Sequence, residues 1–265
     1  MIQNSIKGTG TIRIASWNVN GLRAINRKGF TEFIRQNNFD IVCLQETKIP
    51  QEKIPPELLV LEGYFSYFSA AERPGYSGVA IYSKIKPLQS DNSFGIPRFD
   101  NEGRVLRLDF KDFILFNTYM PNGGRSMQRL DYKLDFYDSF LKYLEGLIEE
   151  GRKIILTGDI NTAHEAIDLA RPRQNENNTG FLPQERAWID RLIKAGFTDA
   201  FRFFNKEPGN YTWWDYKTRA RERNVGWRLD YFFASNNLIA NLKNSEIMHQ
   251  IQGSDHCPIV LELAY

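Results

Sequence analysis

The sequence predicts an α/β fold in which mixed β-sheets are covered by helices. Short segments rich in β-branched and aromatic residues recur along the 265 residues, and segments with helical periodicity lie between several of them. Two neighbouring segments, 105–110 and 113–119, are separated only by Lys111 and Asp112, an arrangement typical of a hairpin. Strands mixed with helices in this way favour sheets that carry helices on their faces.

The predicted strands are short apolar runs, and several of them end directly in polar side chains. In chain order they cover residues 11–18, 40–45, 79–83, 105–110, 113–119, 153–159, 229–234 and 259–263. Polar groups at the ends of strands and in loops are often functional, because a rigid scaffold displays them there.

One helix is predicted more clearly than the others. Large apolar side chains recur at alternating spacings of four and three residues, and Gly151 follows where a helix C-cap is expected. We expect this stripe to face the core; it consists of Leu130, Leu134, Tyr137, Leu141, Leu144 and Ile148.

The composition is that of a globular protein with almost no net charge. Hydrophobic residues make up 42% and charged residues 25%, which argues against disorder, and no linker-like or repeated segment divides the chain. Lys and Arg outnumber Asp and Glu by 34 to 32, so the net charge of +2 excludes indiscriminate binding of polyanions by bulk charge. We expect a short flexible arm over 1–11 and one domain over 12–265.

The sequence also predicts the compartment. Cys43 and Cys257 are the only cysteines, so a disulfide framework is not expected. No apolar run approaches the roughly 18 residues of a membrane span, and the first residues have no signal-peptide pattern. We therefore expect a cytoplasmic protein with no membrane partner.

Polar residues follow the apolar runs at five places. They are Asn18 with Asn20, Gln45 with Glu46, Asp159 with Asn161, Asp230, and Asp255 with His256. One such placement is more often a turn than a functional group, because Asn and Asp commonly bond to nearby backbone. Five placements that include several carboxylates and an imidazole favour an active site.

The chemistry of this set favours phosphodiester hydrolysis. Carboxylate and amide oxygens suit a hard cation such as Mg²⁺ or Mn²⁺, and the absence of a Cys/His cluster disfavours zinc. Among the three histidines, His256 has an adjoining carboxylate, whereas His164 and His249 are more simply explained as structural. A cation, an Asp that takes a proton from water and a His that stabilises phosphate charge form a hydrolytic set.

Six motifs resemble the exonuclease III class of abasic-site endonucleases, in the endonuclease/exonuclease/phosphatase superfamily. In the order of that family they are SWNVNGLRA, LQETK, TYMPNGGR, GDINTAH, NVGWRLDYF and GSDHCP, and they run from residue 16 to residue 258, so the resemblance covers essentially residues 12–265. GDIN and SDH are shared with DNase I-like nucleases, inositol-polyphosphate phosphatases and sphingomyelinases. NVGWRLDYF and LQETK are more specific to DNA repair. The resemblance implies a four-layered α/β sandwich of two packed mixed sheets flanked by helices.

The resemblance also implies a role for each matching residue. Glu46 resembles the principal metal ligand, with Asn18 and Asn20 beside it; Asn20 replaces an Asp of many relatives. Asp255 matches a position of metal binding or site architecture. Asp159 resembles the residue that activates water, and His256 the phosphate-binding histidine oriented by Asp230. The positions that align or contact the scissile phosphate are matched by Asn161, Tyr119 and Asn122.

Three apolar residues match the pocket that receives an extruded abasic sugar: Trp213, Trp227 and Leu229. Extrusion costs least where no base stacks or pairs, so a small apolar pocket selects abasic sites. For the two tryptophans alone, plain core packing is the simpler interpretation.

The segment 217–228 holds five basic residues and one acid, and basic residues interleaved with aromatics suit DNA. We expect Lys217, Asn224 and Arg125 to contact DNA, with Arg219 and Arg221 either doing so or lying in a solvated loop. Lys217 stands where relatives have an apolar residue, and insertion of Lys217 and Arg125 into the duplex would stabilise an extruded nucleotide that keeps its base. Some archaeal relatives, which ARERNVGWRLDYFF resembles, incise beside deoxyuridine, and the loop 175–180 offers amides for a uracil edge.

The leading hypothesis is a Mg²⁺-dependent enzyme, with Mn²⁺ as a substitute, that cuts double-stranded DNA 5′ to abasic sites. A 3′→5′ exonuclease or 3′-repair activity is expected to accompany it, with incision at deoxyuridine as a second activity and a monomer as the active form. Two alternatives stay open: a phosphatase or lipid phosphodiesterase on the same scaffold, and a non-catalytic binder of damaged DNA.

Overall fold

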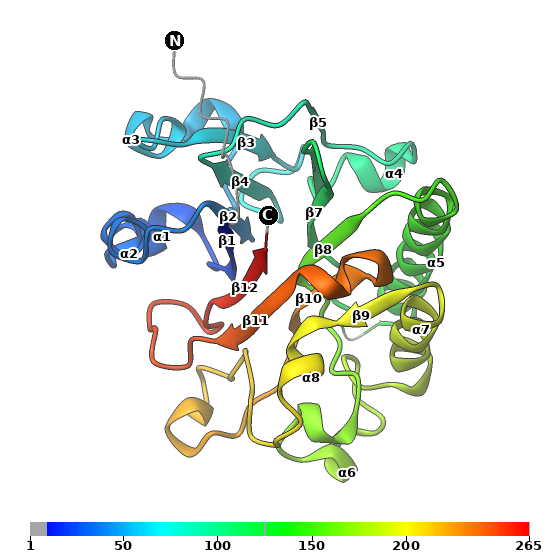
Figure 1. Ribbon diagram of the computed structural model, residues 1–265. Helices are drawn as coiled ribbons and strands as arrows, with labels where there is room; N and C mark the ends of the chain where they lie inside the picture. Colours follow the sequence, from blue (N-terminus) through cyan, green and yellow to red (C-terminus); the bar gives the residue numbers. More distant parts are fainter. Residues whose placement is uncertain (1–9, 125, 265) are drawn as a thin grey trace.

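The computed structural model describes residues 10–124 and 126–264 and has the predicted four layers (Figure 1). In this part of the chain the strands form two mixed sheets that pack face to face, with helices on both outer sides. The predicted arm lies outside the described residues up to residue 9, and Thr11 is already paired in a strand. The same part of the chain contains no helix long and apolar enough to cross a membrane.

The first sheet places the last strand of the chain beside the first. β12 pairs antiparallel with β1, and β1 pairs parallel with β2, so one parallel pair lies among antiparallel neighbours. The order across the sheet is β11 (Leu242–Ile247), β12 (Ile259–Ala264), β1 (Thr11–Asn18), β2 (Ile41–Gln45), β4 (Val79–Ser83) and β3 (Phe65–Ser69).

The second sheet repeats this arrangement, with β7 and β8 as its parallel pair. The hairpin predicted over 105–110 and 113–119 is present as antiparallel β6 and β7. The order across the sheet is β5 (Gln89–Asp91), β6 (Val105–Asp109), β7 (Ile114–Tyr119), β8 (Ile154–Asp159), β10 (Asp230–Ser235) and β9 (Phe197–Asp199).

Helices cover the two outer faces. Beside the first sheet lie α1 (Leu22–Asn26), α2 (Phe30–Asn37) and α3 (Pro56–Leu59), whose Leu22, Phe30 and Leu58 are buried against it. Beside the second lie α5 (Met127–Glu149) and α7 (Pro183–Lys194). The remaining helices are α4 (Pro97–Asp100), α6 (Pro172–Asn175), α8 (Ala200–Phe204) and the short 3₁₀ turns at Gln51–Lys53, Ala166–Asp168, Ala220–Arg223 and Asn236–Asn241.

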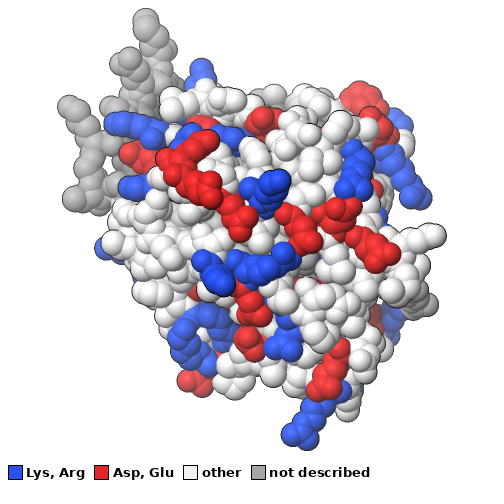
Figure 2. All heavy atoms as spheres, turned by 90° about the vertical axis from the view of Figure 1, so that its right-hand side faces the viewer, with Lys and Arg blue, Asp and Glu red and all other residues white. Residues whose placement is uncertain are grey.

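The predicted helix is α5, but its buried face is rotated from the predicted stripe. Leu130, Leu134 and Ile148 are only partly buried. The side chains that are buried are Lys133, Phe136, Tyr137, Phe140, Leu141, Leu144 and Leu147. The outer surface of the side that carries α5 and α7 shows acidic and basic residues interspersed, without a large patch of one sign (Figure 2).

Candidate active site

Strand register brings the polar strand ends together. Asn18 is the last residue of β1 and lies beside Gln45, the last residue of the parallel strand β2, so Glu46 emerges at the same edge. In the other sheet Tyr119 lies beside Asp159, and Asp159 lies opposite Asp230. Since the two sheets pack face to face, both sets of strand ends contribute to one site.

Three site residues adopt a left-handed backbone conformation just beyond their strands. The φ angles are 49° at Asn20, 54° at Glu46 and 57° at Asn161. Asn tolerates this conformation, but for Glu it is uncommon and costs on the order of 1–3 kcal/mol. At Glu46 the turn is stabilised by its carbonyl oxygen, which accepts from the Gly21 amide at 2.8 Å. These turns aim the side chains into the site.

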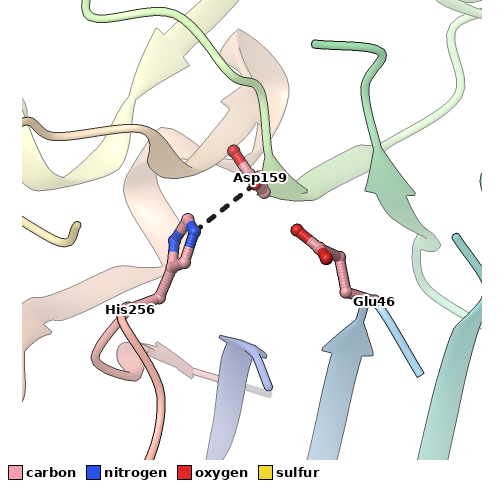
Figure 3. A group of neighbouring side chains, drawn as sticks. All are labelled: Glu46, Asp159 and His256. Carbon is pink, nitrogen blue, oxygen red and sulfur yellow. Dashed lines mark ion pairs between the residues drawn. The ribbon is translucent and has the colours of Figure 1, made fainter. Parts of the chain in front are cut away.

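Glu46, Asp159 and His256 form the centre of the site (Figure 3). One ligand atom from each, two carboxylate oxygens and a ring nitrogen, lie within 4.8 Å of one another. His256 Nε2 lies 3.8 Å from Asp159 Oδ2, and the Glu46 carboxylate points toward the same space. The three residues come from the ends of β2 and β8 and from the loop before β12, and their arrangement is compatible with a metal site.

Asn18 and Asn20 frame this centre. The Asn18 amide donates to Glu46 Oε1 and to Asp159 Oδ2, each at 2.9 Å, while its oxygen accepts from the Asn20 backbone at 3.1 Å. Asn20 Oδ1 accepts from Lys48 Nζ, and its amide donates to Asp255 at 3.0 Å. Through their N–H donors the two amides orient the carboxylates of Glu46, Asp159 and Asp255.

Asp255 has a similar architectural position. Its Oδ1 accepts from Asn20 and from Ser254 Oγ, and its Oδ2 accepts from Trp213 Nε1 at 3.1 Å. Burial alone would raise the pKa of Asp255, but the His256 charge and these hydrogen bonds lower it. Asp255 therefore ties the polar centre to the aromatic side of the site.

His256 is oriented by Asp230, as the resemblance implied. Its Nδ1 lies 2.8 Å from Asp230 Oδ2, so Nε2 faces the centre of the site. Burial would lower the pKa of His256, but the charges of Asp230 and Asp159 outweigh burial and raise it to about 10. The imidazole is thus held as a cation that can donate a hydrogen bond to an anionic group.

Asp159 has a carboxylate suited to accepting a proton. Burial raises its pKa to about 7; the nearby carboxylates of Asp230 and Glu46 add to the increase, and the charge of His256 opposes it. Its Oδ1 accepts from the Asn161 amide at 2.8 Å, which fixes its orientation. A base with a pKa near neutrality is well matched to deprotonating water.

A pocket of about 270 Å³ opens beside this centre. The predicted aromatic residues form one side of it, with Trp213 and Trp227 edge-to-face at 6.4 Å between ring centroids. The complete lining is Glu46, Tyr119, Asn122, Asp159, Asn161, Thr179, Gly180, Trp213, Trp227, Leu229, Asp255 and His256. Apolar side chains and the polar centre of the site therefore share one cavity.

Tyr119 and Asn122 lie at this pocket with their partners on the chain. The Arg104 guanidinium lies 4.9 Å from the centroid of the Tyr119 ring. Burial and the Glu46 charge raise the pKa of Tyr119 well above its ordinary value, so its hydroxyl keeps its proton. The Asn122 amide donates to Asn161 Oδ1 at 3.0 Å, and Asn161 donates to Met120 O at 2.9 Å.

The remaining predicted DNA contacts do not line the pocket. Lys217 lies in the exposed segment 216–219, and Asn224 uses its side chain locally, accepting from Trp214 Nε1 and donating to Gly209 O. The backbone amide of Trp214, two residues before this segment, donates to the Asp255 carbonyl oxygen at 3.0 Å. Burial and the Asp255 charge raise the pKa of Tyr216. Arg125 lies outside the described residues.

Two basic residues counted toward DNA binding have internal roles. Arg228 is fully buried, where it bonds Asp168 at 2.8 and 3.0 Å and Asp199 at 2.7 Å. Arg221 donates to the carbonyl oxygens of His249 and Ile251 at 2.7 and 2.6 Å. The net positive charge counted over residues 217–228 is therefore larger than the positive charge that this segment exposes. Buried acids elsewhere in the chain neutralise part of it.

The structure also adds residues that the sequence analysis did not assign. Lys48 Nζ pairs with Glu46 Oε2 at 2.5 Å, and its place in LQETK, two residues after Glu46, was the available signal. Thr179 and Gly180 line the pocket, although only the amides of their loop had been considered. Lys133, on the buried face of α5, bonds to the Asn161 carbonyl; a lysine among apolar residues was the signal there.

Comparison with known proteins agrees with this geometry. Residues 15–256 match the model of the Endonuclease/Exonuclease/phosphatase family. The chain is 42% identical over 252 residues to an exodeoxyribonuclease of Bacillus subtilis, covering 94% of this chain and 98% of that protein. It is 43% identical over 256 residues to the DNA repair nuclease APEX1 of Danio rerio, covering 96% and 82%.

Among solved structures, the AP endonuclease LMAP from Leishmania major superposes with a TM-score of 0.87 at 30% identity. That match covers 96% of this chain and 88% of the other. The fold, the family model and the full-length relatives agree, and the chain belongs to the endonuclease/exonuclease/phosphatase family.

Proposed function

We propose that the protein is a Mg²⁺-dependent DNA-repair nuclease that hydrolyses the phosphodiester 5′ to an abasic site in double-stranded DNA. The product carries a 3′-hydroxyl, and a 3′→5′ exonuclease or 3′-repair activity accompanies the incision. One observation carries the proposal: a small apolar pocket formed by Trp213, Trp227 and Leu229 shares its cavity with Asp159 and His256. A base-free sugar is the DNA unit that such a pocket favours.

The relatives support the same substrate. Those reported above are named an exodeoxyribonuclease, a DNA repair nuclease and an AP endonuclease, and the first two match nearly the whole of this chain. The pocket argues against the phosphatase alternative, because its aromatic side has no evident use for a highly charged inositol phosphate. All the polar residues that the resemblance assigns to the reaction are present, which argues against a non-catalytic binder.

The donor set fits a divalent cation. Glu46 is the proposed ligand, because its carboxylate faces the same space as Asp159 and His256. Carboxylate oxygens suit Mg²⁺ and Mn²⁺, and such an ion would polarise the phosphoryl group and offset its charge. Lys48 already pairs with Glu46, so it holds this carboxylate in place through its positive charge.

The residues of the chain divide the reaction among them. We assign Asp159 to take a proton from the attacking water, whose oxygen forms the new bond to phosphorus while the bond to the 3′ oxygen breaks. The imidazolium of His256, held by Asp230, donates to a phosphoryl oxygen as its negative charge grows. We assign Asn161, Tyr119 and Asn122, which line the same pocket, to the alignment of the phosphate.

The direct test uses a duplex oligonucleotide with one tetrahydrofuran residue as an abasic analogue. We expect a single cut on its 5′ side that requires Mg²⁺ or Mn²⁺ and stops with EDTA. Cleavage that survives EDTA would contradict the metal-assisted mechanism. Turnover of inositol phosphates or sphingomyelin without nicking of the duplex would favour the alternative substrate class, and binding without cleavage would favour the non-catalytic binder.

Incision beside deoxyuridine is a second proposed activity. It depends on the exposed Lys217, which is free of the internal contacts that engage Arg221. The loop amides are less suited to a uracil edge than the sequence suggested, because Asn175 donates to Arg171 O and Asn178 donates to Asn175. The test is cleavage of a deoxyuridine duplex that is lost in Lys217→Ala or Arg125→Ala while abasic cleavage persists.

A further inference from the structure

An ion pair is completely buried behind the pocket, between the two outer helices of the second sheet. Lys133 of α5 and Glu185 of α7 both have fully buried side chains, and Nζ lies 2.6 Å from Oε1. Lys and Glu are almost never fully buried unless they are paired and hydrogen bonded. The contacts of the two ends show what the pair connects.

The lysine end holds the loop that carries the catalytic residues. Nζ donates to the carbonyl oxygen of Asn161 at 2.7 Å and to Thr162 Oγ1 at 2.9 Å, so with Glu185 all three ammonium protons have acceptors. Asn161 is left-handed and orients Asp159 through its backbone amide. The position of this loop is therefore fixed from behind by Lys133.

The glutamate end holds a neighbouring wall of the pocket. Glu185 Oε2 accepts from the backbone amides of Gly180 and Leu182 at 2.6 and 3.0 Å, and Oε1 accepts from Thr179 Oγ1 at 2.8 Å. Thr179 and Gly180 are pocket residues themselves.

The two held segments meet directly at the pocket. Gly180 O accepts from the Ala163 amide at 2.8 Å. A Cβ at Gly180 would lie 3.3 Å from the Trp227 ring and 3.4 Å from the Asn161 carbonyl oxygen, and its φ is 92°. The catalytic loop, the pocket wall at Gly180 and the Trp227 indole, which is expected to face the sugar, are therefore closely packed against one another.

We propose that the Lys133–Glu185 pair is a positioning device that sets the spacing between the catalytic loop 159–162 and the pocket wall 179–180. Through this spacing it controls both the rate of cleavage and the preference for a base-free sugar. The inference rests on the proposed function, since it assigns a specificity role within that site. Neither residue lines the pocket, so both are positioning residues.

The choice of charged residues supports this role over simple packing. A buried ion pair is seldom more stabilising than apolar residues of the same volume, because both charges lose their hydration. Apolar residues at 133 and 185 would fill the space but could not bond two separate loops. The pair supplies directed contacts to Asn161, Thr162, Thr179, Gly180 and Leu182.

The test compares Lys133→Met, Glu185→Gln and their double variant with Leu192→Ala. Leu192 is fully buried on α7, the helix that carries Glu185. Its truncation therefore destabilises α7 without removing a contact to the pocket. Single-turnover rates and KM are measured on the abasic duplex and on an undamaged 3′ end, together with the melting temperature. Each single variant leaves one buried charge without its partner, whereas the double variant removes both charges. The double variant therefore distinguishes a loss of positioning from the effect of one unpaired buried charge.

For each pair variant we expect about 10- to 100-fold lower kcat on the abasic duplex, because small misplacements at a reacting centre are costly. The ratio of abasic to undamaged cleavage should fall as the wall loosens, and the Gly180 amide should exchange hydrogen faster. Leu192→Ala should keep kcat and the ratio within about twofold of the wild type while lowering the melting temperature.

The inference is overturned if the pair variants melt earlier but keep both kcat and the substrate ratio. Should the single variants fail to fold, Thr162→Val removes an acceptor of Lys133 without changing a residue of the pocket lining, and it must still lower the ratio. If the wild-type protein does not cut abasic DNA at all, the proposed function fails. The positioning claim is then judged by hydrogen exchange at Gly180 in Glu185→Gln, which does not depend on activity.

Discussion

At the scale of single residues, Asp159 is a buried carboxylate held by hydrogen bonds to both of its oxygens. Its carboxylate accepts from Asn18 and Asn161 and lies 3.8 Å from His256 Nε2. Burial and two neighbouring carboxylates make its negative charge unfavourable, as its raised pKa of about 7 shows. The fold therefore tolerates a destabilising charge where the proposed reaction needs a base.

Asp159→Asn tests both consequences. We expect the single-turnover rate on the abasic duplex to fall by about 10²–10³ or more, because a key transition-state group is lost. The melting temperature should stay the same or rise, since a buried charge is removed. Asp112→Asn, in the exposed turn between β6 and β7, is the matched control and should change neither quantity. A fully active Asp159→Asn would rule out the proposed base.

Asp168 illustrates a residue whose role lies in stability. Burial would raise its pKa, but Arg228 and Arg202 outweigh burial and lower it to about 2. Since the pKa is lower in the folded than in the unfolded state, the stabilisation is complete above about pH 4 and is lost as the pH falls toward 2.

We expect Asp168→Asn to lower the free energy of unfolding at pH 7 by about 3–5 kcal/mol, because Arg228 loses a buried partner. The difference from the wild type should shrink between pH 4 and pH 2, where the wild-type carboxylate becomes protonated. Urea unfolding at several pH values measures this. A difference that stays constant down to pH 2 would contradict the assigned linkage.

Individual site residues could be predicted from the sequence better than individual charges. Asn18, Glu46, Asp159, Asp230 and His256 follow apolar runs, and strand register then brings them together. Arg228 was counted among the bases that face DNA. Its partners Asp168 and Asp199 lie 60 and 29 residues away in the chain, and the composition of one segment does not reveal such distant partners. Lys133 and Glu185 were missed for the same reason, since they are 52 residues apart.

At the scale of elements, interior strands were predicted and edge strands were not. The strands expected over 11–18 and 79–83 have those bounds in the structure. The missed strands β3, β5, β9 and β11 are the edge strands of the two sheets. Edge strands carry polar side chains and depend on their neighbours, so an isolated sequence such as LKNSEI gives little apolar signal.

The rotation of α5 has a related cause. The predicted stripe used Leu130, Leu134 and Ile148, whereas the helix buries Lys133, Phe136, Phe140 and Leu147 between the sheet and α7. Hydrophobic periodicity does not count a lysine as a core residue. The predicted buried face is therefore shifted by about one residue from the observed one. Tertiary hydrogen bonds to Asn161, Thr162 and Glu185 make the burial of Lys133 favourable.

Gly146 within α5 and Gly151 just after the helix should respond oppositely to alanine. Gly146 is helical and exposed with no atom within 4 Å of an added Cβ, so Gly146→Ala should stabilise by about 0.5–1 kcal/mol. Gly151 follows the helix with φ of 73° and is equally open, so Gly151→Ala should destabilise by about 1–2 kcal/mol through backbone strain alone. Thermal unfolding measures both, and shifts of the same sign would contradict the assignment of the C-cap.

At the scale of the whole molecule, the net charge is close to zero because acidic and basic residues balance while they occupy different places. Acids gather in the site and in buried pairs, and the face over α5 and α7 mixes both signs (Figure 2). The exposed bases Lys217 and Arg219 follow Trp214, whose backbone amide donates to the Asp255 carbonyl oxygen at 3.0 Å. We therefore expect DNA to be held by a few well-placed cations.

The salt dependence of binding measures how many cations contact phosphates. Lys217→Gln should reduce the slope of log K against log salt by about 1, because one phosphate contact is lost. Lys142→Gln, an exposed lysine on α5, is the matched control and should leave the slope unchanged. Equal slopes for the wild type and both variants would show that Lys217 does not contact the backbone of bound DNA.

The position of β12 has a consequence for biosynthesis. This strand lies between β11 and β1, and the loop just before it supplies His256. Glu46, Asp159 and Asp230 are all translated earlier, but a chain that ends before residue 256 lacks the imidazole and leaves β1 and β11 without their shared partner. With the roles proposed above, a growing polypeptide would hold Glu46, Asp159 and Asp230 before it could place the imidazole, so we expect cleavage only after β12 has left the ribosome.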